Sequence, residues 1–198
     1  MALKQTPSQT VGPFFAYGLT APQYGYAFGG IAGSAIAGEA TEGRRIRVVG
    51  QVFDGTGEAV LDAMIEVWQA NASGRYTHPA DTRRDNLDPT FKGFGRFGTG
   101  TDPQRRFIFD TVKPGAVGDG QAPHISVIVT ARGIANHLYT RLYFPDEPEA
   151  NRRDPVLLSV PAARRDTLMA IAADNTDGNV YRFDIHLQGP RETVFFDV

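Results

Sequence analysis

Short runs of alternating apolar and polar residues, separated by turn residues, recur along most of the chain. Apolar side chains fall on every second position, as at Phe107 and Phe109 or at Ile125, Val127 and Val129, which is the period of a half-buried β-strand. We predict strands in the segments 45–60, 61–70, 105–112, 124–131, 137–144, 180–189 and 193–198. About seven short strands with turns between them favour an all-β fold, in particular a β-sandwich.

The first two of these segments are separated by strong turn residues. Asp54-Gly55 and Thr56-Gly57 stand between a β-branched run and the alternating run at 61–70, so we predict a hairpin-like pair. The connection from Asn71 to Arg106 is polar and rich in glycine. A loop of that length in a compact domain is usually either functional or disordered.

Helical patterns are sparse, and we expect one or two short helices. The segment 146–154 begins with Asp146, a good N-cap residue, and predicts a short helix. The segment 161–174 places Leu168 and Ile171 at helical spacing and predicts a second helix.

The chain has 198 residues, of which 41% are hydrophobic, and this is enough for one core. We expect a single domain over residues 1–198, with an N-terminal docking arm at 1–20 and an irregular, glycine-rich loop at 21–43. The arm contains the adjacent Phe14 and Phe15, which would not be left in water without a partner surface. That surface can belong to the same domain or to another chain.

Charge and cysteine content exclude several classes of function. The net charge is −2, with a pI near 6.1, and no long run of one charge occurs, so neither nucleic acid nor a membrane surface is an expected partner. The absence of cysteine excludes disulfides and zinc–thiolate sites and is compatible with a reducing cytosol. The first ten residues lack the apolar core of a secretory signal, and residues 21–38 lack the sustained apolarity of a membrane span. We therefore expect the protein in the cytoplasm.

The sequence His124-Ile125-Ser126 is the first place where metal chemistry is worth considering. In a strand, two residues separated by one point to the same face, so a His-x-His pair could bind a metal, but here the second position is serine. A lone histidine at the start of a strand is more often a hydrogen-bonded structural residue. Tyr76 follows a Ser-Gly turn, and the simplest interpretation is structural: its ring packs against the protein and its hydroxyl contacts solvent.

Arg132 follows an apolar strand and precedes a glycine, so its charge is carried at a strand end. Such an arginine is usually a solvated charge or a loop clamp. Its functional alternative is bidentate recognition of a carboxylate.

Several segments, in this order, resemble the intradiol ring-cleavage dioxygenases over nearly the whole chain. They are PSQTVGPFF, GQVFDGTGEAVLDAMIEVWQANASGRY, TVKPGAV, APHISVIVTARG, TRLYFPDEPEAN, DPVL and YRFDIHLQGPRETVFFDV. The terminal FFD resembles the alpha chains of heteromeric members in particular. The resemblance implies a prealbumin-like β-sandwich and an assembly of paired alpha and beta chains in a larger oligomer.

The resemblance also implies the reaction. A non-haem ferric ion, held by two tyrosines and two histidines of the beta chain, binds protocatechuate as a catecholate. O2 then cleaves the ring between the two hydroxyl-bearing carbons to give 3-carboxy-cis,cis-muconate, a step of aromatic catabolism in the beta-ketoadipate pathway. Ferric iron would therefore be a cofactor of the partner and not of this chain.

The four iron-ligand positions of the family fall on Tyr76, Val117, His124 and Ser126. Valine offers no donor, and serine offers only a neutral hydroxyl, which is a poor ferric ligand. The loss of one phenolate also removes negative charge that ferric iron needs. The resemblance therefore implies a vestigial iron site, with no metal ligand and no catalytic residue in this chain.

The resemblance further implies that the chain completes the substrate pocket of its partner. The arm residues Thr10, Gly12, Pro13 and Phe14 match the segment that approaches that pocket, although Phe14 lacks the hydroxyl of the tyrosine found in many alpha chains. Arg132 matches an arginine near the substrate carboxylate. We therefore expect these five residues to position substrate.

Two other functions are compatible with a β-sandwich. A homomeric dioxygenase of catechol or hydroxyquinol would carry a helical N-terminal dimerisation region and all four iron ligands, and the sequence has neither. A transthyretin-like binding or structural module would share only the fold. Such a module would be monodisperse alone, whereas an obligate alpha chain would expose apolar surface.

Overall fold

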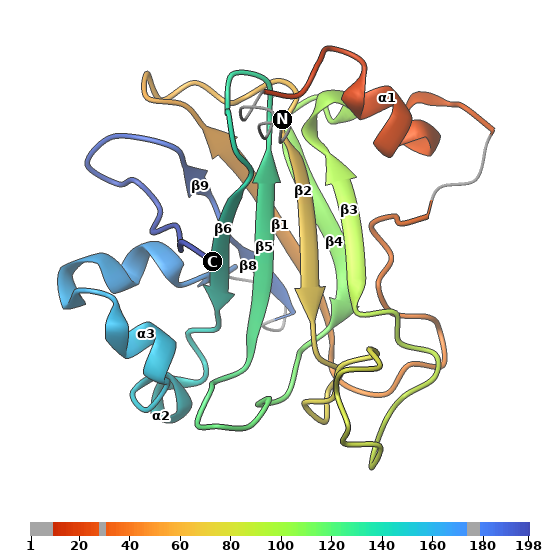
Figure 1. Cartoon of the computed structure of the whole chain (residues 1–198), viewed down its shortest axis with the longest axis vertical. Helices are drawn as coiled ribbons and strands as arrows, with labels where there is room; N and C mark the ends of the chain where they lie inside the picture. Colours follow the sequence, from red (N-terminus) through yellow and green to blue (C-terminus); the bar gives the residue numbers. More distant parts are fainter. Residues whose placement is uncertain (1–9, 28–30, 174–178) are drawn as a thin grey trace, which may run out of the picture.

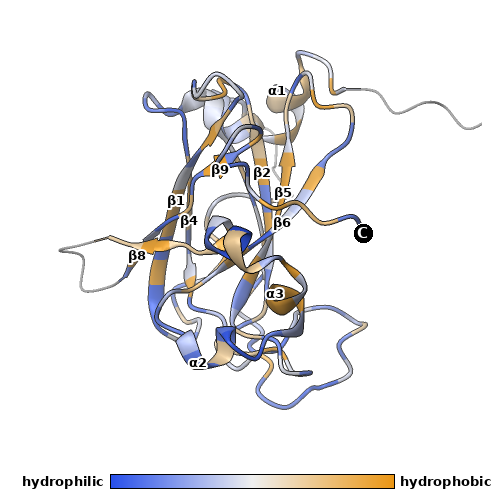
Figure 2. Cartoon of the chain, turned by 90° about the vertical axis from the view of Figure 1, so that its left-hand side faces the viewer, coloured by the Kyte–Doolittle hydropathy of each residue, from blue (hydrophilic) through white to orange (hydrophobic). Residues whose placement is uncertain are grey.

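A computed structural model describes residues 10–27, 31–173 and 179–198 and places two β-sheets face to face (Figure 1). In the described residues, the first sheet contains β1 (Arg45–Phe53), β4 (Arg106–Val112), β7 (Ile171–Ala172), β8 (Val180–Arg182) and β9 (Ile185–His186). The second contains β2 (Met64–Gln69), β3 (Phe94–Gly98), β5 (His124–Thr130) and β6 (Leu138–Tyr143). Figure 2 shows the two sheets as separate layers, with β1 and β4 in one and β2, β5 and β6 in the other.

The long strand β1 is the centre of the first sheet. It pairs antiparallel with β4 along its length and parallel with β8 and β9. Gly50 lies opposite Phe107, and a Cβ atom at Gly50 would lie 1.8 Å from the carbonyl oxygen of Phe183 and 2.6 Å from the Phe107 ring. Only glycine permits this close approach of β1 to the Phe107 ring and to the backbone at Phe183.

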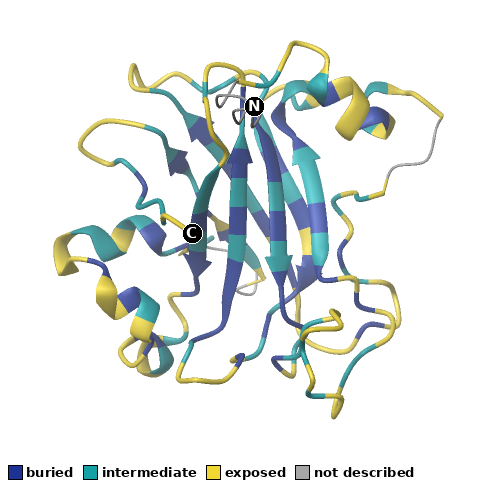
Figure 3. Ribbon diagram, in the orientation of Figure 1, coloured by how far each residue is buried: buried dark blue, intermediate teal, exposed yellow. Residues whose placement is uncertain are grey.

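The second sheet has the order β3-β2-β5-β6, with every pair antiparallel. Its strands alternate as the sequence predicts, with one face buried in the core (Figure 3). On β5 the inward residues are Ile125, Val127 and Val129. The residues between them therefore point to the outer face of the sheet.

Short helices lie around the sheets. They are α1 (Phe15–Leu19), α2 (Pro148–Asn151) and α3 (Pro155–Ser159), with the 3-10 helices η1 (Ala21–Tyr24), η2 (Thr99–Thr101) and η3 (Ala162–Leu168). A second, small core joins α3 and η3 to the sheet through Leu157, Leu168 and Tyr143. Asp154 caps α3 by accepting a hydrogen bond of 2.8 Å from the Leu157 amide.

The predicted all-β sandwich is confirmed in its coarse form, as two facing sheets with few helices. The described residues contain three α-helices instead of the expected one or two. The closer likeness to prealbumin and the single domain over 1–198 stay predictions.

The predicted hairpin of 45–60 with 61–70 is wrong. The turn forms, and the Asp54 amide donates to the Glu58 carbonyl at 3.0 Å, but the antiparallel pairing ends after one bridge between Phe53 and Ala59. The chain then crosses to the second sheet, where β2 pairs with β3 and β5. The apolar residues of β1 and β2 therefore meet across the core and not along one sheet.

The short helix predicted in 146–154 is confirmed as α2, but its N-cap and the second helix prediction need correction. The segment 161–174 forms η3 and then the strand β7, which leaves Ile171 exposed, and the predicted helix end near Asn175 lies outside the described residues. In the segment 146–154 the N-cap of α2 is Glu147, because Asp146 instead accepts hydrogen bonds from Lys113 and from Tyr181.

Three strand predictions also change. The connection 71–106, predicted as loop, contains β3. The segment 180–189 divides into β8 and β9. The segment 193–198 contributes a single bridge, between Phe196 and Tyr139.

Candidate functional site

The four positions that match iron ligands, which we call the remnant site, lie on β5 and on two neighbouring loops. His124 and Ser126 are on the outer face of β5. Ser126 lies opposite Trp68 of β2 on one side and opposite Arg141 of β6 on the other. Residues directly opposite one another share a face of the sheet. The alternation predicted from the sequence therefore places the remnant site on the outer face.

The loop after β2 and the loop before β5 are held against each other. The Asn71 side chain fixes the first by accepting hydrogen bonds from the amides of Ser73 and Arg75 at 3.0 and 2.9 Å. Gly74 has a φ of +73°, and a Cβ atom there would lie 1.9 Å from the Ala116 carbonyl oxygen. This close contact requires glycine and keeps the two loops together around one pocket.

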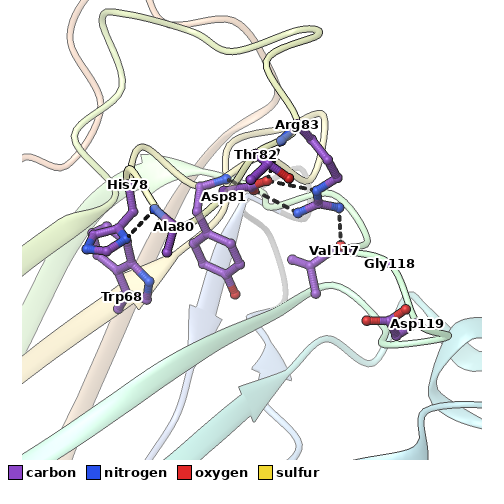
Figure 4. Close-up of a pocket in the computed structure, with 10 residues that line it drawn as sticks. Trp68, His78, Ala80, Asp81, Thr82, Arg83, Val117, Gly118 and Asp119 are labelled. Atoms are coloured by element: carbon purple, nitrogen blue, oxygen red, sulfur yellow. Dashed lines mark hydrogen bonds and ion pairs between the residues drawn. The ribbon is translucent and has the colours of Figure 1, made fainter.

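That pocket has a volume of about 590 Å³ and brings Tyr76 and Val117 together. Figure 4 shows Arg83 between the two loops. Its guanidinium donates to both oxygens of Asp81, at 2.9 and 2.8 Å, and to the Val117 carbonyl. The hydrogen bond with Arg83 is the main reason why the pKa of Asp81 lies well below its usual value. Asp81 is therefore committed to an ion pair.

The Tyr76 ring stacks on Trp68, with centroids 5.7 Å apart and planes 11° from parallel. Burial raises the pKa of the Tyr76 phenol, although the charges of Arg141 and Arg83 act against this rise. The phenol is therefore protonated at neutral pH. It serves as a packing residue, as the ordinary reading of the sequence expects.

His124 is buried, with 1% of its surface exposed. Its Nδ1 lies 2.8 Å from the Ala122 carbonyl oxygen, and Nε2 has no hydrogen-bond partner among the described residues. A proton on Nδ1 leaves a lone pair on Nε2, which is the tautomer of a histidine oriented for a metal. Burial first, and the charge of Arg141 second, lower the pKa of His124 to about 4.

The remnant site does not fit ferric iron. Its two other positions, Val117 and Ser126, offer no donor and a neutral hydroxyl, which leaves two of the four ligands without a replacement. In the described part of the chain, no cluster of three or more His, Cys, Asp or Glu side chains could bind a metal. One well-oriented imidazole is all that the site retains.

The described part of the N-terminal arm docks on its own domain. The Thr10 hydroxyl accepts a hydrogen bond from the Gly133 amide at 2.7 Å and donates to the Ala131 carbonyl at 3.4 Å. Further along, Arg96 of β3 donates to the Leu19 carbonyl at 3.3 Å. Residues 1–9 of the predicted arm lie outside the described residues.

The structure brings Thr10 next to the turn that carries Arg132. Gly12 and Pro13 follow as exposed residues, and 77% of the Phe14 surface is exposed. The Nε atom of Arg132 donates to Asp62, and the side chain remains about half exposed. The predicted substrate residues thus gather at one end of the sandwich, where Arg132 is paired with Asp62 through Nε.

The remnant site and the Arg132 turn lie at opposite ends of β5. Six residues separate His124 from Thr130 along the strand, which corresponds to about 20 Å at about 3.3 Å per residue. Arg132 lies beyond that end. A substrate that contacts Arg132 is therefore not in the remnant site of the same chain.

Sequence reasoning missed two charged residues beside these groups. Arg141 stands at an outward position of an alternating strand, but its place beside Ser126 depends on the register of β6 against β5. Asp62 is 70 residues from Arg132, and no local pattern connects them.

Among the helices of the described residues, none has the length and apolar composition of a membrane span.

Comparison with known proteins gives consistent matches. A family model described as dioxygenase matches residues 20–189. The protocatechuate 3,4-dioxygenase alpha chain of Burkholderia cepacia is 54% identical over 198 residues, which cover 99% of this chain and 98% of the relative. The beta chain of the enzyme from the same organism is 40% identical over 157 residues, covering 74% of this chain and 66% of the relative.

Solved structures agree at the level of the fold. The dioxygenase domain of a carbohydrate-binding fusion protein from Streptomyces sp. SirexAA-E superposes with a TM-score of 0.60. It is 24% identical, and the match covers 96% of this chain and all of that one.

Proposed function

The chain belongs to the intradiol dioxygenase family, and on that premise we propose that it is the alpha subunit of a protocatechuate 3,4-dioxygenase. With an iron-bearing beta subunit, it takes part in the O2-dependent cleavage of protocatechuate to 3-carboxy-cis,cis-muconate. The observation that carries this proposal is the full-length match to an alpha chain, at 54% identity. Family membership speaks against a transthyretin-like module. Higher-order assembly and a place in the cytoplasm belong to the same proposal.

The geometry supports a division of work between two chains. The remnant site does not fit ferric iron, so the iron that would hold the catecholate belongs to the beta subunit, where it would activate the ring for cleavage by O2. This chain's own residues act at the other end of β5, where Thr10 joins the arm to the Arg132 turn. About 20 Å of strand separates that turn from the remnant site. Arg132 therefore reaches a substrate held in a partner chain.

Arg132 is suited to bind the carboxylate of protocatechuate. Asp62 engages Nε, and the two terminal nitrogens have no partner among the described residues. Two parallel N–H groups match the two oxygens of a carboxylate. Asp62 holds the guanidinium in one orientation, and Arg132 then neutralises and orients the benzoate anion.

The arm supplies surface for the partner. Gly12 and Pro13 are exposed; glycine has no side chain, and the proline ring is compact, so a partner can approach the backbone closely. Phe14 projects a ring that is 77% exposed, and the nearby Tyr17 ring, with its centroid 6.3 Å away, is 42% exposed. Adjacent exposed aromatic rings are typical of surfaces that become buried on association.

Iron content and the visible spectrum test the division of work. The chain purified alone should be colourless and free of iron, whereas the complex with its beta subunit should be iron-containing, coloured and active. A tyrosinate-to-iron absorption band from this chain alone would contradict the proposal, since it would mean that Tyr76 and His124 recruit other ligands.

Arg132→Ala tests the carboxylate contact in the assembled enzyme. A hydrogen-bonded charge contributes about 1.5 to 3 kcal/mol, so KM for protocatechuate should rise by about 10-fold to 150-fold. KM for catechol, which has no carboxylate, should change much less. Arg47→Ala, which removes an exposed arginine on the other sheet, is the matched control. Equal effects on the two substrates would exclude the carboxylate role.

A further inference from the structure

The outer face of β5 and β6 carries a cation beside the remnant site. Arg141 lies directly opposite Ser126, the position that would hold the second histidine of an iron site. Directly opposite residues have Cβ atoms about 5 Å apart and point to the same side. His124 and Tyr143 form the next pair on that face, with ring centroids 5.8 Å apart. One arginine therefore shares the face with both histidine positions.

The hydrogen bonds of Arg141 direct its guanidinium toward the remnant site. Nη1 donates to Gln121 Oε1 at 2.9 Å and lies 3.5 Å from the Tyr143 hydroxyl. Gln121 belongs to the loop between Val117 and β5. The guanidinium thus lies toward that loop and the His124–Tyr143 pair, and away from the Arg132 end of the strand.

The surviving residues on two different elements both experience the charge of Arg141. It opposes the burial that raises the pKa of Tyr76, and it adds to the burial that lowers the pKa of His124.

Nearby acidic groups are committed elsewhere. Arg141 forms no ion pair with the described residues. Asp81 is paired with Arg83. Asp154 accepts from the Ala122 amide at 2.8 Å and from the Tyr143 hydroxyl at 3.2 Å. Arg141 therefore has no carboxylate at ion-pair distance among the described residues, and the nearest described anion on this side is Asp154, which lies behind the Tyr143 hydroxyl.

We propose that the charge of Arg141, which lies on the same outer face as His124 and Ser126, excludes metal from the remnant site independently of the lost ligands. The guanidinium supplies one positive charge on the face where Tyr76 and His124 remain. A ferric ion bound there would be next to this charge, and like charges at short range in a partly buried site repel strongly. The site is closed to cations by charge as well as by ligand loss.

The decisive comparison restores the lost ligands with and without the cation. The double variant Val117→Tyr/Ser126→His would be made in three versions: with Arg141 unchanged, with Arg141→Gln and with Arg141→Lys. Each version would be co-expressed with the beta subunit. Iron per alpha–beta pair would be measured, together with the intensity of the tyrosinate-to-iron band. Glutamine keeps a hydrogen-bond donor toward Gln121 without charge, whereas lysine keeps the charge.

We expect the Arg141→Gln version to bind about one additional iron per pair, and the other two versions to gain about a tenth of that. Equal iron content in the three versions, whether all gain iron or none does, would overturn the proposal. Equal gains in the glutamine and lysine versions would overturn it too, because charge would not be the obstacle. Melting temperature and assembly size verify that each variant is folded and paired.

A second measurement needs no restored ligand. Arg141→Gln in the otherwise unchanged complex should bind Cu²⁺ about tenfold more tightly than the parent complex, because it removes the positive charge from the pair of residues next to His124 on the same face. Arg141→Lys should bind Cu²⁺ with the affinity of the parent complex. Because all three complexes contain the same other histidines, comparing them also corrects for Cu²⁺ bound at those histidines. Identical Cu²⁺ affinities for the three complexes would contradict the inference.

Discussion

Lowering the pH from 7 to 5 should destabilise the folded chain through His124. Its pKa is about 4 in the fold and 6.5 in its ordinary state, so between these values the unfolded chain binds a proton that the folded chain does not. The contribution of His124 to the free energy of unfolding is fully present above pH 6.5 and decreases as the pH drops. Below about pH 4 it does not decrease further. The loss is about 2 kcal/mol between pH 7 and 5, and about 3 kcal/mol in all.

Scanning calorimetry at pH 7, 6 and 5 measures this loss. At about 2 to 4 °C per kcal/mol, the parent should lose about 4 to 8 °C of Tm through His124 between pH 7 and 5. His124→Asn retains an amide that can donate to the Ala122 carbonyl and should flatten that slope. His137→Asn, at an exposed position, should keep the parent slope. If the His124→Asn slope equalled the parent slope, a buried neutral imidazole would be excluded.

Three further changes test the fold and the arm. Gly50→Ala places a Cβ atom 1.8 Å from the Phe183 carbonyl oxygen, so we expect a loss of about 3 kcal/mol or more in urea unfolding. Asp154→Ala leaves the Leu157 amide and the Tyr143 hydroxyl without their acceptor and should cost about 3 kcal/mol, whereas a melting temperature within error of the parent would contradict the cap. Deleting residues 1–15 should weaken assembly with the beta subunit in size-exclusion chromatography, and an unchanged, fully active complex would remove the arm from the proposal.

Local patterns predicted the strands well because alternation depends only on neighbours in sequence. Which strands pair depends on residues far apart in the sequence, and the wrongly predicted hairpin shows that local patterns do not determine it. The turn residues from Asp54 to Glu58 behave as predicted, but the partner of β2 is decided by Val127 and its neighbours, more than 50 residues away. A two-sheet sandwich and a continuous hairpin leave the same local pattern in the sequence.

Two other errors come from weak or overridden propensity. In β3, FGRFG contains two glycines and therefore has little intrinsic preference for a strand, but pairing with β2 holds it extended. The helical spacing of Leu168 and Ile171 was real, yet Ile171 pairs with Arg182 of β8 and the helix ends at Leu168. In both cases tertiary pairing decides the conformation.

In the candidate site, too, the sequence predicted what depends on single side chains and missed what depends on long-range pairing. Residue identity alone showed that Val117 and Ser126 cannot bind ferric iron, because ligand chemistry belongs to the side chain. The sequence could not place Arg141 beside Ser126, since a shift of one residue in the register of β6 would move it to the core face. Nor could it show that Thr10 bonds to the Arg132 turn, which joins segments 123 residues apart.

The two ends of β5 should therefore be independent. His124 begins β5 and Arg141 lies opposite Ser126, about 20 and 13 Å along the strand from Thr130, and the Arg132 turn begins beyond Thr130. Residues so far apart without shared partners act additively. Removing the charge of Arg141 should change metal uptake and leave KM for protocatechuate unchanged, whereas removing Arg132 should do the reverse. On the proposed function, one strand would carry both a remnant site without metal and, beyond its other end, residues that serve the site of a partner. Coupling between the two substitutions would mean that the strand transmits changes from one end to the other, and the division of work proposed for the chain would then fail.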